Sequence, residues 1–128
     1  MKDQLFEIPG RLAGANELIG GINRNRFIGA SIKKKETARC AEAALGLKKI
    51  DYPVKIVISW FEPNARRDID NVSFGAKFVL DGLIQAGKLS NDGRKQVQAI
   101  QHEFPSPCPE NPRVSVWIQE YINGMGLI

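Results

Sequence analysis

The sequence feature that most constrains the fold is an apolar strand pattern that runs directly into a charged loop. Every second residue from Val54 to Trp60 is apolar, which predicts a β-strand with one face in the core. The loop that follows holds two bases and two acids: Arg66, Arg67, Asp68 and Asp70. Because a strand end is a rigid support for a loop, the sequence predicts a polar site at the end of this strand.

The segment after this loop, residues 71–86, is expected to form one helix that supports the site. Its apolar residues repeat at helical spacing, and Gly87 is a good stop. Asp70 and Lys77, seven positions apart, would share one helix face. Asp92 follows in the next loop. That loop can span at most about 17 Å against a helix of about 22 Å, so a return to the other acids within one chain is feasible with little slack. We expect this return, because Leu89 can pack on the apolar stripe of the helix and guide it. The alternative is that a partner subunit completes the site.

Three more segments alternate as strands do: residues 5–9, 97–104 and 113–121. The last two are expected to pair antiparallel across the proline-rich turn between them. His102, the only histidine, would then lie within a strand on a polar face, and we give it no catalytic role.

The N-terminal half is expected to hold one further long helix, over residues 30–47, with Ser31 as its N-cap. Residues 11–26 are rich in glycine and asparagine, and they predict a polar loop with a helical turn or two. Together these elements predict an α+β fold. Residues 1–128 would form a single domain in which a mixed sheet of about four strands packs against two main helices.

Charge and composition limit the classes of function. The net charge of +4 favours an anionic partner such as nucleic acid, and Arg24 and Arg26 form a basic patch of the kind that contacts a DNA backbone. No apolar run approaches 18 residues and no signal-peptide core is present, so we expect a cytoplasmic protein without membrane contact. Cys40 and Cys108 have no metal-ligand spacing and are expected to be reduced thiols.

The aspartates are the candidate catalytic and metal-binding residues. Carboxylates that lie together repel each other and raise their own pKa values unless a cation lies among them, and oxygen ligands suit Mg²⁺. Calcium binding in an EF-hand loop is excluded, because Val72 and Ser73 stand where an oxygen ligand and a glycine are required. A haloacid-dehalogenase-type phosphatase remains an alternative, although its aspartates end a buried strand and Asp68 follows a polar loop.

The run from Arg67 through Asp68 and Asp70, followed by Lys77 and the Asn91-Asp92 pair, closely resembles the RusA-type Holliday junction resolvases of bacteria and their prophages. The resemblance is strong over the central third of the chain. Two departures are visible. Lys77 stands seven residues after the second aspartate where the family has four, and Asn91 stands where an aspartate can occur.

The resemblance implies a homodimeric, Mg²⁺-dependent endonuclease that resolves four-way DNA junctions in recombination and repair. It implies that Asp68, Asp70 and Asp92 form the acidic metal site, that Lys77 is the catalytic lysine, and that Arg67 contacts phosphate. Arg24, Arg26 and Arg66 join Arg67 as candidate DNA-binding residues. The alternative is a DNA-binding dimer, derived from a prophage resolvase, that no longer cleaves.

Overall fold

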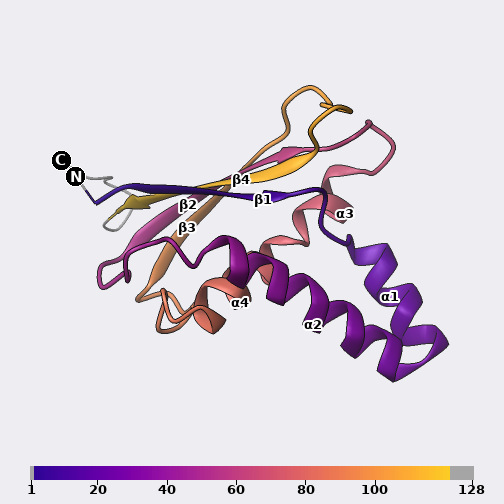
Figure 1. Ribbon diagram of the computed structural model, residues 1–128, viewed down its shortest axis with the longest axis horizontal. Coiled ribbons are helices and arrows are strands. Elements are labelled where there is room, and N and C mark those ends of the chain that lie inside the picture. Colours follow the sequence, from indigo (N-terminus) through magenta and orange to yellow (C-terminus); the bar gives the residue numbers. More distant parts are fainter. Residues whose placement is uncertain (1, 122–128) are drawn as a thin grey trace.

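The computed structural model describes residues 2–121, which form one four-stranded sheet with helices on one of its faces (Figure 1). The elements in chain order are β1 (Gln4–Pro9), α1 (Ala15–Arg24), α2 (Arg26–Ala43), β2 (Val54–Phe61), α3 (Ile69–Ser73), α4 (Ala76–Gln85), β3 (Val97–Glu103) and β4 (Arg113–Glu120). This architecture confirms the expected α+β class, the mixed sheet and its four strands.

The strands lie in the order β1-β4-β2-β3. β4 pairs antiparallel with both β1 and β2, whereas β3 pairs parallel with β2. The expected antiparallel pairing of β3 with β4 is therefore wrong. A parallel pair needs a crossover connection, which α3 and α4 supply here, and the long proline-rich segment lets β4 cross to the other side of β2.

The core lies between the helices and one face of the sheet. The alternation in β2 is confirmed, because Val54, Ile56, Ile58 and Trp60 are all buried. The same face of the neighbouring strands adds these buried residues: Phe6, Ile8, Val114, Val116 and Ile118. On the opposite face Leu5 and Trp117 are exposed, so helices cover only one side of the sheet in the described part of the chain.

Residues 15–43 form a helical hairpin where a loop was expected over much of its length. α1 covers the glycine- and asparagine-rich segment, and α2 starts at Arg26, four residues before the expected start. Asn25, not Ser31, is the N-cap: its side-chain oxygen accepts a hydrogen bond of 2.7 Å from the Phe27 N–H. Lys33 to Lys35 thus lie beyond the first turn, where the helix dipole does not penalise cations.

The expected helix over residues 71–86 is interrupted. α3 ends at Ser73 and α4 begins at Ala76, with tight i to i−3 hydrogen bonds from Gly75 to Val72 and from Lys77 to Phe74 between them. A Cβ on Gly75 would lie 3.0 Å from the Trp60 ring. The break therefore occurs where the chain lies so close to the sheet that a larger residue would require the Trp60 ring to shift by a few tenths of an ångström.

Both cysteines are free, as expected. Burial raises the pKa of the Cys40 thiol to about 12, so this thiol stays protonated at neutral pH. Among residues 2–121 no helix is long and apolar enough to span a membrane.

Candidate active site

Asp68 and Asp70 lie at the start of α3, just beyond the end of β2, and both are exposed. Asp68 occupies the N-cap position, yet its side chain makes no capping hydrogen bond. Asp70 accepts one hydrogen bond of 2.9 Å, from the N–H of its neighbour Asn71. The two carboxylates thus retain most of their oxygen lone pairs for a ligand, at the place where the sequence predicts a site.

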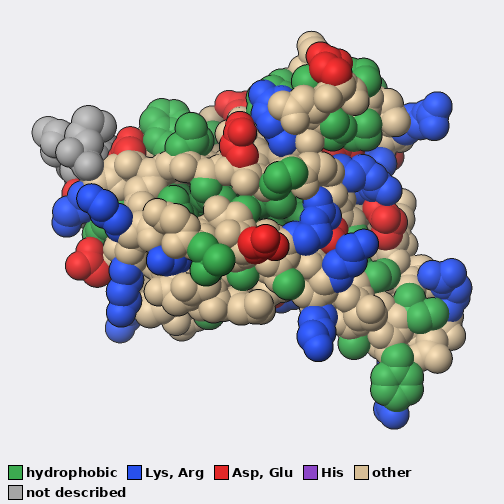
Figure 2. All heavy atoms as spheres, viewed as in Figure 1, with side chains coloured by type: hydrophobic (Ala, Val, Ile, Leu, Met, Phe, Trp, Pro, Cys, Tyr) green, Lys and Arg blue, Asp and Glu red, His purple; other side chains and the backbone are tan. Residues whose placement is uncertain are grey.

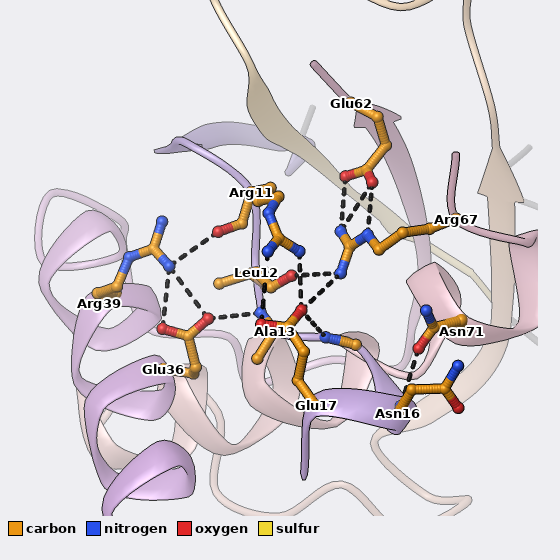
Figure 3. A network of polar contacts seen from close by, with 11 residues as sticks. Arg11, Leu12, Ala13, Asn16, Glu17, Glu36, Arg39, Glu62, Arg67 and Asn71 are labelled. Atoms are coloured by element: carbon orange, nitrogen blue, oxygen red, sulfur yellow. Dashed lines mark hydrogen bonds and ion pairs between the residues drawn. The ribbon is translucent and has the colours of Figure 1, made fainter. Parts of the chain in front are cut away.

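Arg67 anchors the loop that carries these aspartates (Figure 3). Its Nε and Nη2 donate to the two oxygens of Glu62 at 2.8 Å each, and the two side chains are only 16% and 13% exposed. Its Nη1 donates to the Leu12 carbonyl at 3.0 Å and to Glu17 at 3.2 Å. With nearly every donor engaged inside the protein, Arg67 holds the loop to β2 and to the start of α1, instead of offering its guanidinium to phosphate as expected.

Glu17 joins this anchor to the helical hairpin. Its carboxylate accepts from Arg11 at 2.7 Å and from the Gly14 N–H at 3.1 Å, besides Arg67. Burial alone would raise the pKa of Glu17, but the hydrogen bonds and the positive charges of the two arginines outweigh burial and lower it. Glu17 therefore stays ionised and keeps α1 beside the acidic loop.

A second contact ties α1 directly to α3. The Asn71 side-chain oxygen accepts a hydrogen bond of 2.9 Å from the Asn16 N–H (Figure 3). Nearby, Glu36 accepts from the Ala13 N–H and from Arg39, which fixes the chain just before α1 to α2. The acidic loop, α1 and α2 are thus linked by hydrogen bonds into one unit.

Lys77 lies on α4 and pairs with Asp81 one turn further on, with 3.5 Å between Nζ and Oδ2. Its side chain is 52% exposed. Its expected alignment with Asp70 required a continuous helix, and the break at Gly75 removes that argument. An exposed ion pair of this kind contributes little to stability, so Lys77 is able to leave Asp81 for another anion.

Asp92 lies at the opposite end of the sheet from the other two acids. Because β3 is parallel to β2, the loop before β3 adjoins the start of β2: the Val54 N–H donates to the Gln96 carbonyl at 2.9 Å. Asp68 follows the far end of β2, whose eight residues advance about 26 Å. The expected return of Asp92 to Asp68 within one chain is therefore not seen.

Leu89 holds the loop before β3 near the start of β2. Leu89 is buried in the core, but it forms a parallel β-bridge with Ile50, four residues before β2, and does not lead the chain back along α4. In the described part of the chain, no three His, Cys, Asp or Glu side chains form a group that could hold a metal ion.

A magnesium ion fits the chemistry of the Asp68–Asp70 pair but not the expected trio. Mg²⁺ keeps several waters and takes only one or two carboxylates directly, preferably oxygens that are not already hydrogen-bonded. The exposed Asp68 and Asp70 meet that requirement, since a single hydrogen bond engages one of their oxygens. Within one chain, these two are the residues that would hold the ion.

The other predicted DNA-binding residues are separated into two places. Arg66 is exposed beside the acidic loop. Arg24 ends α1 and Arg26 begins α2, both exposed at the turn of the helical hairpin. Of the four arginines, only Arg67 is mostly buried. Nothing in the sequence around Arg66 and Arg67 indicates which of the two turns into the protein.

His102 faces the helices, and not the polar face expected for it. Its ring stacks on Trp60 at a centroid distance of 5.9 Å, and its Nδ1 accepts a hydrogen bond of 2.9 Å from the Trp60 indole. Burial lowers the pKa of His102 and keeps it neutral. The sequence analysis did not predict that Glu62 and Glu17 bind Arg67. The signal that could have indicated the first contact is the position of Glu62 just after the strand, five residues before Arg67.

The comparison with known proteins adds no family to this geometry. No protein-family model matches the chain, and no curated protein matches it significantly. A function for this chain therefore has to be inferred from its own residues, above all from the anchored acidic loop and the exposed cations.

Replacement of Arg67 by alanine should lower stability strongly. The change leaves the mostly buried Glu62 carboxylate without its partner, and we expect a loss of about 3 kcal/mol in the free energy of unfolding. The neighbouring Arg66→Ala, at an exposed position, should change it by less than about 0.5 kcal/mol. Urea denaturation compares the two variants, and equal stability for both would contradict the anchor assigned to Arg67.

Stability should also decline when His102 becomes protonated. The pKa of His102 in the folded state lies below its ordinary value of 6.5, so the unfolded chain takes up the proton first. The contribution is complete above about pH 6.5 and is lost as the pH falls through the folded-state pKa. Denaturation at a series of pH values between 7 and 5 should show this loss, and His102→Gln should abolish it. A wild-type stability that rises on acidification would refute the assignment.

Proposed function

We propose that the protein is a Mg²⁺-dependent, structure-specific endodeoxyribonuclease that cleaves four-way DNA junctions as a homodimer. The observation that carries the proposal is the pair of exposed carboxylates of Asp68 and Asp70, which have few hydrogen bonds and lie on a loop fixed by the mostly buried Arg67–Glu62 ion pair. Charged side chains without partners, held in place by a rigid support, are typical of a catalytic site. The resemblance of this loop to the RusA-type resolvases supports the same assignment.

The residues have distinct roles in this mechanism. When bound, Mg²⁺ would supply Lewis-acid polarisation of the phosphodiester and orient the attacking water. Asp68 and Asp70 would hold the ion at the end of β2. Lys77 can leave Asp81 and place its charge near the developing negative charge, and Arg66 is free to contact a phosphate. Arg67 does not touch substrate in this scheme; it positions the aspartates.

Asp92 enters the site from the partner subunit. Within one chain Asp92 and Asp68 are held at opposite ends of β2, and the loop of Asp92 is tied to the start of that strand through Leu89 and Gln96. A two-fold dimer can place the Asp92 end of one subunit beside the Asp68 end of the other. Two such shared sites suit the approximate two-fold symmetry of a four-way junction.

A non-cleaving DNA-binding dimer is the second candidate function. The exposed cations alone would support it, since binding to phosphate needs no acidic residues. The two carboxylates favour the nuclease, because acids without partners weaken the binding of a purely DNA-binding surface.

Asp70→Asn should abolish cleavage of a synthetic four-way junction while binding persists. The carboxylate serves the metal, whereas affinity comes mainly from basic contacts to phosphate. The matched control is Asp51→Asn, an exposed aspartate just before β2, which should cleave like the wild type. Gel assays with a junction and a linear duplex, with and without Mg²⁺, measure both quantities. Full activity of Asp70→Asn at saturating Mg²⁺ would remove the assignment.

Mixed dimers should reveal whether the acids are shared between subunits. Asp70→Asn and Asp92→Asn homodimers should both be inactive, but a heterodimer of the two would contain one site with all its carboxylates. We expect that heterodimer to nick one strand of a junction at about half the rate of the wild type per dimer. A heterodimer as inactive as its parents would show that each site is built within one chain.

A further inference from the structure

The tip of the α1–α2 hairpin combines strong positive charge with exposed apolar side chains. Residues 18–35 contain no acidic residue but five cations, all exposed: Arg24, Arg26, Lys33, Lys34 and Lys35. No ion pair engages any of them among the described residues. The charge of residues 18–35 is therefore +5, which exceeds the net charge of +4 of the whole chain.

The tip projects from the rest of the molecule (Figure 1). α4 crosses α2 at Cys40 and Ala41, where a Cβ on Gly82 would overlap Cys40. Phe27 lies 13 residues before Cys40, which is about 20 Å along the helix axis. α1 packs on this part of α2, and Gly29 allows that contact by admitting the side chain of Ile22. The hairpin thus forms a narrow arm with its own packing.

Phe27 stands at the end of this arm and is 68% exposed. The Arg26 guanidinium lies 5.0 Å from the centre of its ring. The Phe27 N–H donates to the Asn25 cap, so the ring is presented by a fixed turn and not by a loose loop. Ile19 and Ile22, one turn apart on α1, are also exposed. Figure 2 shows hydrophobic and basic side chains together at this end of the molecule.

We propose that the hairpin tip is a nucleic-acid-binding wedge in which Phe27 stacks on an unpaired base at the branch point while Arg24 and Arg26 contact the flanking phosphates. Apolar side chains that enter a base step unstack it, and aromatic rings stack on any base because every base has a π-face. The inference rests on the proposed function, since it names the element that recognises the branch in the DNA.

The arrangement of the lysines favours DNA strands over a flat membrane surface. Lys33, Lys34 and Lys35 are consecutive, so their side chains point in directions about 100° apart around α2. A membrane-bound helix keeps its cations on one side, whereas an arm inserted between DNA arms meets phosphates on several sides. The tip is also held in a fixed position relative to the acidic loop, because the Glu17 and Asn16 contacts fix α1 to that loop and to α3.

The wedge is tested by measuring base unstacking in a DNA junction bound by the whole chain. Metal is left out so that no cleavage occurs. A four-way junction carrying 2-aminopurine at its branch point should become more fluorescent when the wild type binds. Phe27→Ala should lose this increase and bind the junction about tenfold more weakly, the effect of one lost stacking contact. Leu45→Ala, at a residue 63% exposed just after α2, should behave like the wild type, and Phe27→Trp should restore the signal.

Salt dependence tests the arginines separately. The double variant Arg24→Gln, Arg26→Gln should lower the slope of log affinity against log salt by about two for junction and duplex alike. If Phe27→Ala binds and unstacks like the wild type, the wedge is overturned even when the wild type cleaves junctions with Mg²⁺. If the wild type unstacks the branch through Phe27 but never cleaves, the proposed nuclease fails and the wedge stands. Binding to phosphatidylserine vesicles through Phe27, without unstacking of DNA, would also overturn it.

Discussion

The parallel pairing of β2 with β3 is the constraint on which the arrangement of this protein depends. A parallel pair requires the chain to travel the length of the sheet between the two strands, and α3 and α4 make that journey. The acidic loop therefore starts the crossover at one end of β2, and Asp92 finishes it at the other. A single chain holds these acids apart, and this separation leads to the proposal of a site shared between subunits.

The Arg67–Glu62 ion pair contributes more to the position of the acidic loop than to the stability of the protein. Arg67 and Glu62 are mostly buried, and pairs of this kind offset their own desolvation without a large net gain. What the pair provides is a fixed geometry, because the planar guanidinium bonds at once to the end of β2, to the Leu12 carbonyl and to Glu17. The acids can stay exposed and unbonded because their backbone is held by neighbours.

The hydrophobic periodicity of the sequence predicted the strands better than it predicted which strands pair. The alternation from Val54 to Trp60 correctly predicted β2 and its buried face, and Asp68 and Asp70 follow that strand as expected. Periodicity does not say which strand lies beside which, so the parallel partner of β3 was missed. The break at Gly75 depends on the Trp60 ring, a contact between distant parts of the chain, and a helical pattern continues across it unchanged.

The same limit applies to the site residues. Arg66 and Arg67 are adjacent and chemically identical, and only the folded chain places Glu62 and Leu12 around one of them. Only a turn or two of α1 was expected, because its glycines lower helix propensity, whereas Gly21 of α1 and Gly29 of α2 let the two helices pack closely. Composition correctly located the cations near Arg24 and Arg26 but could not show that they stand on a projecting arm.

The acids of one chain lie far apart, and we propose that they meet those of a second chain. Spin labels on Arg66→Cys and Arg94→Cys, both exposed and each two residues from an acid, would measure this in a Cys108→Ser background with Cys40 buried. For a doubly labelled chain diluted in unlabelled protein, we expect a separation above about 20 Å, close to the length of β2. Singly labelled subunits mixed together should show a shorter distance. A distance of about 10 Å within one chain, close enough for both acids to reach one ion, would contradict the account.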